Sequence, residues 1–181
     1  MGRQYRWQIP LSERRFAPMI EGLTVSSDVV EIEAPAALVW DVLVDFANYG
    51  KWNTFCPVAE AELVLDTPIR MQVDLGFGLQ EQVEYICLIE PGYRVAWRME
   101  NRPEDPIHAV RTQTIEPLGK NCCSYVSVDE FGGPGAEEMM GALGKPVETG
   151  FNRCAYDLKA YCEKRFAAMR MRCSGPDRGV M

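Results

Sequence analysis

Residues 29–55, VVEIEAPAALVWDVLVDFANYGKWNTF, constrain the fold more than any other part of the chain. They read as a strand, a sharp boundary at Ala34-Pro35, an amphipathic helix and an aromatic-rich turn. Pro35 suits the first helical position, because the N–H that it lacks would have no partner there. A strand that feeds a short helix so early in a chain needs a large apolar surface to pack against. The rest of the sequence must therefore supply a sheet.

Alternation of apolar and polar residues predicts that sheet. The predicted strands span residues 23–33, 58–65, 69–75, 80–89, 93–99, 107–116 and 122–131. The strand at 69–75 is typical, since Ile69, Met71 and Val73 share one face and Arg70 lies on the other. Evenly spaced hairpins of this kind indicate an antiparallel meander that curls toward a half-barrel.

A long helix is predicted over residues 136–172. Its second half has one apolar stripe, formed by Phe151, Cys154, Ala155, Leu158, Cys162, Phe166 and Met169. Its first half contains Gly141, Gly144, Pro146 and Gly150, which we expect to kink or interrupt the helix.

Composition limits the class of protein. A chain of 181 residues is expected to form one domain, here at 23–172, with an N-terminal extension at 1–22 and a flexible tail at 173–181. The net charge of −7 disfavours nucleic acid and anionic lipid surfaces as partners, because both require basic patches. No signal peptide and no apolar run of about 18 residues is visible, so we expect a cytoplasmic protein without membrane insertion.

Several segments are similar to one known superfamily. EIEAPAALVWDVLVDFANYGKWN resembles the N-terminal signature of the SRPBCC, or START-like, superfamily, and within it the polyketide cyclase/dehydrase branch. TIEPL, DEFGG and GFNRCAYDLKAYCEKR resemble the last strands and the closing helix of that branch. The resemblance implies an α+β helix-grip fold, in which a curved antiparallel sheet of six to seven strands wraps around a long C-terminal helix. One or two short helices would follow the first strand.

The resemblance also implies a deep cavity between the sheet and the terminal helix. Such cavities in this superfamily bind lipids, sterols, polyketides and other apolar small molecules. Aromatic-polyketide cyclases carry a tyrosine near the position of Val58 and an inward arginine near the position of Glu81. Both groups are missing here, so the resemblance names a family and not an activity.

Three residues are candidates for catalysis. His108 is the only histidine, and it would act either as a general acid or base at the cavity or as a strand-end residue near solvent. Arg111 and Glu130 lie on neighbouring predicted strands. They would either form an ion pair inside the fold or point outward. A buried ion pair would be costly in free energy unless a ligand used it.

Aromatic and apolar side chains make up the predicted ligand-binding set, with ordinary core packing as the alternative. The set comprises Tyr49, Trp52, Phe55, Met71, Val73, Tyr85, Val95, Trp97, Tyr125, Phe131, Met140, Leu143, Val147 and Phe151. Flexible residues on the first half of the terminal helix suggest an adaptable lid or ordinary packing over the cavity mouth. We expect no cofactor and no metal site, because one histidine cannot build a His-rich site.

The sequence leaves three functions open. The first hypothesis is binding of an apolar small molecule, such as a lipid or polyketide, in the cavity. The second is an enzyme of the polyketide cyclase or dehydratase type that transfers protons, with His108, Arg111, Tyr85 and Glu130 as carriers. The third is a regulatory protein-interaction module. A homodimer stays open as an alternative, and whether any reaction is catalysed is undecided.

Overall fold

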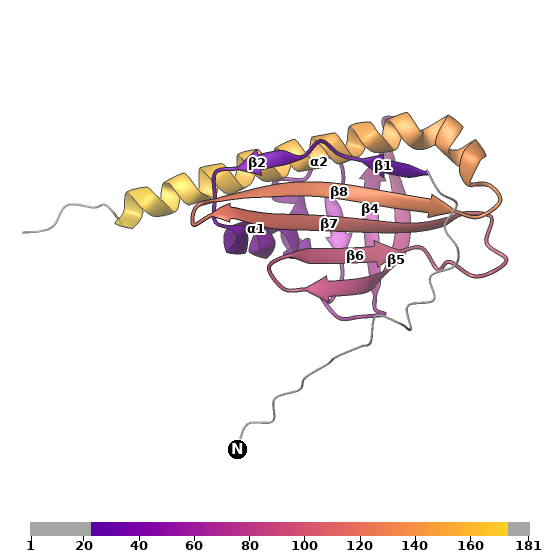
Figure 1. The fold of residues 1–181 in the computed structure, drawn as a ribbon, viewed down its shortest axis with the longest axis horizontal. Helices are drawn as coiled ribbons and strands as arrows, with labels where there is room; N and C mark the ends of the chain where they lie inside the picture. Colours follow the sequence, from indigo (N-terminus) through magenta and orange to yellow (C-terminus); the bar gives the residue numbers. More distant parts are fainter. Residues whose placement is uncertain (1–22, 174–181) are drawn as a thin grey trace, which may run out of the picture.

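A computed structural model describes residues 23–173 of the chain, so the predicted extension at 1–22 and the residues of the tail beyond 173 lie outside the described part. The strands are β1 (Thr24–Ser26), β2 (Val30–Ile32), β3 (Val58–Glu60), β4 (Pro68–Asp74), β5 (Leu79–Glu90), β6 (Arg94–Arg98), β7 (His108–Gly119) and β8 (Cys122–Gly132). The helices are α1 (Ala36–Leu43), the 3-10 helix η2 (Phe46–Lys51) and α2 (Ala136–Cys173). Figure 1 shows the curved sheet with α2 running along it. This is the predicted α+β helix-grip fold.

The eight strands form one antiparallel sheet in the order β1-β8-β7-β6-β5-β4-β3, and β2 also pairs with β8. The eighth strand arises because the predicted strand at 23–33 is divided into β1 and β2. At the break, the Ser27 N–H donates to the Ser127 carbonyl at 2.9 Å. The Ser127 N–H in turn donates to Ser27 Oγ at 3.0 Å. These reciprocal bonds hold the break against β8.

Two short helices follow β2, as predicted. In α1, Val39, Val42 and Leu43 are buried, which leaves the opposite face to solvent. Pro35 is the N-cap of α1, one position earlier than the first helical position that the sequence suggested. Helix η2 buries Tyr49, whose hydroxyl donates to the Leu43 carbonyl at 2.7 Å and so ties the two helices together.

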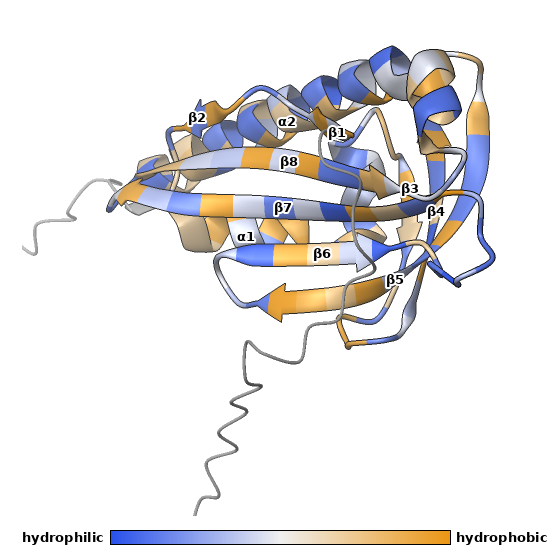
Figure 2. Cartoon of the chain, turned by 45° about the vertical axis from the view of Figure 1, so that its right-hand side comes forward, coloured by the Kyte–Doolittle hydropathy of each residue, from blue (hydrophilic) through white to orange (hydrophobic). Residues whose placement is uncertain are grey.

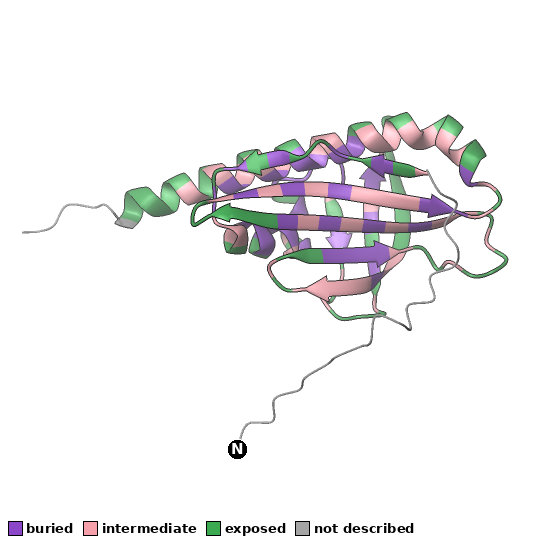
Figure 3. Cartoon of the chain, in the orientation of Figure 1, coloured by how far each residue is buried: buried purple, intermediate pink, exposed green. Residues whose placement is uncertain are grey.

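Helix α2 packs against β1, β2, β8 and α1. It continues through Pro146 without interruption, although Figure 1 shows its first turns bending away from the axis of the rest. Burial is uneven along α2: buried residues gather in its middle, and its C-terminal turns are largely exposed (Figure 3). Phe151, Cys154 and Leu158 in the second half are fully buried, whereas Met139 and Val147 in the first half are only partly buried.

The buried core therefore lies under the second half of α2, between that half, α1, η2 and the inner faces of β7 and β8. Along β7, buried residues alternate with half-buried ones from His108 to Ile115, as expected for a strand with one face on the core. Strand β5 differs, because its first residues, 79–83, are all exposed.

Blue hydrophilic and orange hydrophobic residues are interspersed along both halves of α2 in Figure 2.

Candidate functional site

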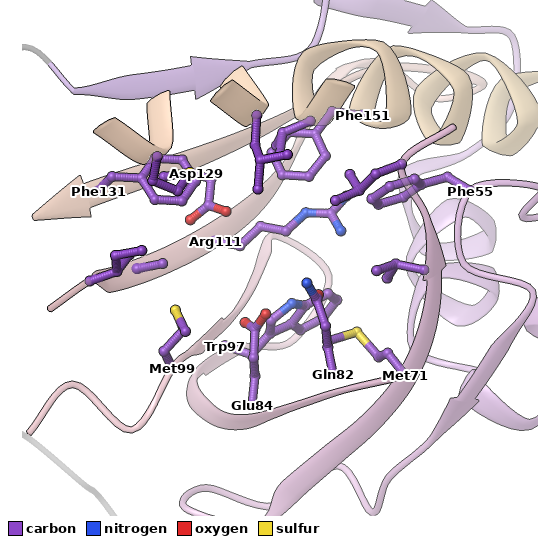
Figure 4. A pocket seen from close by; sticks show the side chains of 17 residues that line it. Phe55, Met71, Gln82, Glu84, Trp97, Met99, Arg111, Asp129, Phe131 and Phe151 are labelled. Carbon is purple, nitrogen blue, oxygen red and sulfur yellow. The ribbon is translucent and has the colours of Figure 1, made fainter. Parts of the chain in front are cut away.

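A cavity of about 220 Å³ lies between the sheet and the first half of α2 (Figure 4). Its lining comes from the loop after η2, from β4 to β8 and their ends, and from α2. The lining residues are Phe55, Met71, Val73, Leu75, Gln82, Glu84, Trp97, Met99, Ile107, Ala109, Arg111, Asp129, Phe131, Met139, Leu143, Val147 and Phe151. Most of these side chains are apolar, and the polar ones are few.

Strand geometry explains why these residues meet. Successive side chains on a strand point to opposite faces, so alternate residues of each strand reach the cavity. Ala109 and Arg111 come from β7 in this way, and Asp129 and Phe131 come from β8. The pairing of β7 with β8 places Arg111 opposite Asp129. The two charged residues of the sheet centre are thus neighbours by register.

Arg111 is the central polar group of the cavity. The residue is 7% exposed, and its Nε donates to Ser127 Oγ at 2.9 Å. Its Nη2 is buried and has no hydrogen-bond partner among residues 23–173. The guanidinium carbon lies 4.0 Å from the centre of the Phe151 ring and 5.6 Å from that of Phe55. Aromatic faces therefore take the place that a carboxylate usually occupies beside a buried arginine.

Two carboxyl groups line the same cavity. Burial raises the pKa of Glu84 to about 7, against the lowering effect of Arg111. Burial also raises the pKa of Asp129 well above its ordinary value, and the nearby Glu84 carboxyl raises it further. Asp129 Oδ1 is buried without a hydrogen-bond partner in the described part of the chain. Near neutral pH the cavity thus holds a fixed cation, one carboxyl close to its titration midpoint and a second carboxyl whose charged form is disfavoured by burial.

A glycine on α2 shapes the aromatic wall. A Cβ atom at Gly150 would overlap the ring of Phe55, so only glycine lets that ring approach the helix. Phe55 in turn packs edge-on against Phe151, with ring centres 5.9 Å apart. Trp97 closes the cavity from β6, and its Nε1 is another buried donor without a partner in residues 23–173. The wall is thus aromatic and holds one unused donor.

The structure brings together part of the predicted site. The predicted residues that line the cavity are Arg111, Phe55, Met71, Val73, Trp97, Phe131, Leu143, Val147 and Phe151. The predicted residues outside the lining are His108, Glu130, Tyr49, Trp52, Tyr85, Val95, Tyr125 and Met140. Tyr49, Trp52, Val95 and Tyr125 are buried in the core instead, and Met140 packs against that core.

The polar residues that were predicted for the site but do not line the cavity lie elsewhere. His108 Nε2 lies 2.7 Å from the Arg102 carbonyl, at the start of β7. Glu130 follows Asp129 and so points to the opposite face of β8. Tyr85 donates to Glu100 Oε1 at 3.3 Å on an exposed surface. The pairing of Arg111 with Glu130 considered from the sequence is therefore replaced by the proximity of Arg111 to Asp129.

Seven lining residues were not among the sequence candidates: Leu75, Gln82, Glu84, Met99, Ile107, Ala109 and Asp129. An eighth, Met139, was expected only as one of the flexible residues that suggested a lid. The most consequential are Glu84 and Asp129. For Asp129 a signal was available, since Tyr125 and Phe131 share its strand phase. For Glu84 the pattern pointed the other way, because the apolar residues of β5 alternate with it and suggested that they, and not Glu84, face inward.

Val58 and Glu81, the positions where aromatic-polyketide cyclases carry their tyrosine and arginine, are exposed and do not line the cavity. No group of three or more His, Cys, Asp or Glu side chains within 23–173 is placed to hold a metal ion. In the same range, no helix has the length and apolar character needed to cross a bilayer.

Comparison with known proteins places the chain in a family. Residues 24–163 match the model of the family described as "Polyketide cyclase / dehydrase and lipid transport". No curated protein matches the chain by sequence. Among solved structures, the Zhui aromatase/cyclase from Streptomyces sp. R1128 is 22% identical, with a TM-score of 0.62 over 78% of this chain and 94% of that one.

Two further structures show the same fold. A hypothetical protein from Helicobacter pylori is 16% identical, with a TM-score of 0.62 over 90% of this chain and 99% of that one. A START superfamily protein from Mycobacterium smegmatis is 16% identical, with a TM-score of 0.52 over 75% of this chain and 98% of that one. The match over residues 24–163 shows that the chain belongs to the polyketide cyclase/dehydrase and lipid transport family.

Proposed function

We propose that the protein binds an apolar small molecule in the cavity between the sheet and the first half of α2. One observation carries the proposal: a mostly apolar cavity contains buried polar atoms without partners, namely Arg111 Nη2, Asp129 Oδ1 and Trp97 Nε1. Buried polar groups without hydrogen bonds are rare in folded proteins, because each costs roughly 1–3 kcal/mol. A ligand that enters the cavity would satisfy them.

The shape of the cavity supports the same function. Apolar walls with a few convergent polar groups are typical of small-molecule sites. The family includes lipid transport in its description, which agrees with such a role. The open cavity also differs from the filled interior that a purely protein-interacting module predicts, so small-molecule functions are favoured.

Native mass spectrometry of the purified protein, followed by organic extraction, tests the proposal. We expect a copurified apolar molecule at near-stoichiometric ratio, or a thermal shift with members of an apolar ligand panel. Val147→Trp should fill the cavity and abolish both signals. The control is Ala142→Trp on the exposed face of α2, which should leave both unchanged. Equal retention of the ligand by both variants would place binding elsewhere and refute the proposal.

A second candidate function rests on Glu84. A carboxyl group whose pKa is raised to about 7 by burial exchanges protons efficiently near neutral pH. If the ligand has an acidic C–H beside a carbonyl, Glu84 would accept the proton and Arg111 would stabilise the enolate oxygen. This is the proton-transfer chemistry that a cyclase or dehydratase would need.

Deuterium exchange distinguishes catalysis from binding alone. 1-Tetralone in D₂O should gain deuterium at C2 faster with wild-type protein than with buffer, as measured by mass spectrometry. Glu84→Gln should abolish the acceleration while retaining ligand binding. Exchange at the buffer rate with a ketone that demonstrably binds would eliminate this candidate and leave the binding function intact.

A further inference from the structure

Arg111 is a buried cation without an ion pair. The described residues form six ion pairs, and none of them includes Arg111. Glu84 and Asp129 line the same cavity, but neither carboxyl group lies close enough to the Arg111 guanidinium to form an ion pair with it. Figure 4 shows the guanidinium pointing toward Phe55 and Phe151, with the Asp129 carboxyl beside the stem of the arginine. The charged end of the side chain is thus directed at aromatic rings and open space.

Aromatic contacts compensate this charge only in part. The guanidinium carbon lies 4.0, 5.6 and 5.7 Å from the ring centres of Phe151, Phe55 and Trp97. Cation–π contacts offset part of the cost of burying a charge, but they leave the hydrogen-bonding capacity of the Arg111 Nη2 atom unused. The remaining deficit would be removed by an anion that reaches the unpartnered Nη2 from the cavity.

Burial makes the acids that face Arg111 poor sources of this anion. From β5 and β8, Glu84 and Asp129 have raised pKa values because of burial. From α2, burial raises the pKa of the Cys154 thiol, so that it stays protonated. Tyr49 on η2 and Tyr125 on β8 are raised by burial as well. Burial thus disfavours the charged form of each of these groups, and Glu84 is mostly protonated below about pH 7.

The size and walls of the cavity restrict the ligand further. Its volume of about 220 Å³ lies below the roughly 300–1,000 Å³ of sites for drug-sized molecules. Rings of Phe55, Phe151 and Trp97 surround the guanidinium, and flat aromatic faces favour planar partners. The lining residues Gln82 and Met99 are exposed and mark the mouth, so the guanidinium lies inside the cavity and not at its rim.

We propose that the ligand is a compact, planar aromatic molecule that carries a carboxylate, and that this carboxylate enters the cavity first and pairs with the Arg111 guanidinium. This inference rests on the proposed binding function and names its ligand class. It separates aromatic acids from neutral lipids and from long-chain acids, whose long aliphatic chains do not match a short aromatic cavity.

A matched ligand series tests the inference by isothermal titration calorimetry at pH 6. The probes are 1-naphthoate, the neutral naphthalene-1-carboxamide, the cationic 1-naphthylmethylamine and the chain-like decanoate. We expect 1-naphthoate to bind at least tenfold more tightly than each of the others. Arg111→Met should bring naphthoate and carboxamide within about twofold of each other, while Arg111→Lys should keep part of the preference because it keeps the charge.

The pH dependence supplies a second readout. As Glu84 ionises beside the guanidinium, the affinity of the wild-type protein for 1-naphthoate should fall several-fold between pH 6 and pH 8. Glu84→Gln should remove this fall, because its side chain stays neutral. A fall of the same size in Glu84→Gln would contradict the arrangement of charges proposed here.

The outcomes separate the inference from the function on which it rests. If the carboxamide or the amine binds wild-type protein as tightly as 1-naphthoate, the anion inference is overturned and the binding function stands. If decanoate binds more tightly than 1-naphthoate, the aromatic part is overturned. If no probe binds and extraction gives no difference between wild type and Val147→Trp, both proposals fail.

Discussion

The two halves of α2 cover the same sheet with opposite results. The second half packs Phe151, Cys154 and Leu158 into a core in which side chains are fully buried. The first half places Met139, Leu143 and Val147 over a cavity and leaves them only partly buried. Glycines and a proline are concentrated in the first half, and apolar residues at helical spacing are concentrated in the second. One helix therefore combines a structural segment with a segment that leaves space for a ligand.

The largest expected difference between the halves is in the free energy of unfolding that is lost when a leucine is truncated to alanine. Leu158→Ala, at a fully buried position, should lower the free energy of unfolding by about 2–5 kcal/mol. Leu143→Ala, the same substitution at the cavity wall, should cost less than about 1 kcal/mol, since that side chain already borders empty space. Urea denaturation of both variants measures this. Equal losses would mean that the first half of α2 is packed as tightly as the second.

The junction of the two halves is sensitive to a single methyl group. Gly150→Ala should lower the free energy of unfolding by about 1–2 kcal/mol, because its Cβ displaces the Phe55 ring from a packed position. Gly141→Ala is the matched control on the same helix, where an added Cβ meets nothing within 4 Å. It should stabilise the protein by about 0.5–1 kcal/mol through helix propensity. Urea denaturation showing stabilisation of both variants would refute the close approach of Phe55.

Function and stability should conflict at the open end. Arg111→Met replaces a buried, unpaired cation by an apolar side chain, and should leave the free energy of unfolding unchanged or raise it by about 1 kcal/mol. The same variant should lose the preference for carboxylates described above. A loss of more than about 2 kcal/mol in urea denaturation would instead show that Arg111 stabilises the fold.

The open end should also make the stability of the protein depend on pH. The pKa of Glu84 is about 7 in the folded protein, above its value in the unfolded chain, so the folded state binds the proton more tightly. The contribution of Glu84 to the free energy of unfolding should therefore be fully present below about pH 4.5. It should be lost as the pH rises toward 7, because Glu84 ionises first in the unfolded chain. Asp129 acts in the same direction. Glu84→Gln should flatten this fall in urea titrations between pH 5 and 7.5, and an unchanged slope would contradict the raised pKa.

The sequence predicted the architecture well because the spacing of the apolar residues and the order of the elements along the chain determine it. Alternation located the strands from β4 to β8 to within a few residues, and the apolar stripe located α2. The split between β1 and β2 was not predicted, although the polar run Ser26-Ser27-Asp28 interrupts the alternation between Val25 and Val30. The reciprocal hydrogen bonds of Ser27 with Ser127 depend on a strand 100 residues away.

The site was less predictable because β5 violates the rule that apolar residues face inward. Val83 and Tyr85 share a phase that suggested the inner face, yet Val83 is 43% exposed and Tyr85 contacts Glu100 outside. A register shift between Ile86 and Leu88 also changes the phase along the strand. Local rules tend to fail where a protein places polar groups for function, and Glu84 is such a place.

The break at Ser27 has a consequence for the order of folding. Ser127 accepts the Arg111 Nε hydrogen bond through its side chain, while its backbone is held by Ser27 from the start of the domain. Contacts between residues so distant in sequence form late, because a long loop must close first. The backbone of Ser127 is therefore held by Ser27 only after the first strand has docked on β8. A chain that has folded its hairpins but not yet added β1 would contain the bond from Arg111 to Ser127 without the support of Ser27.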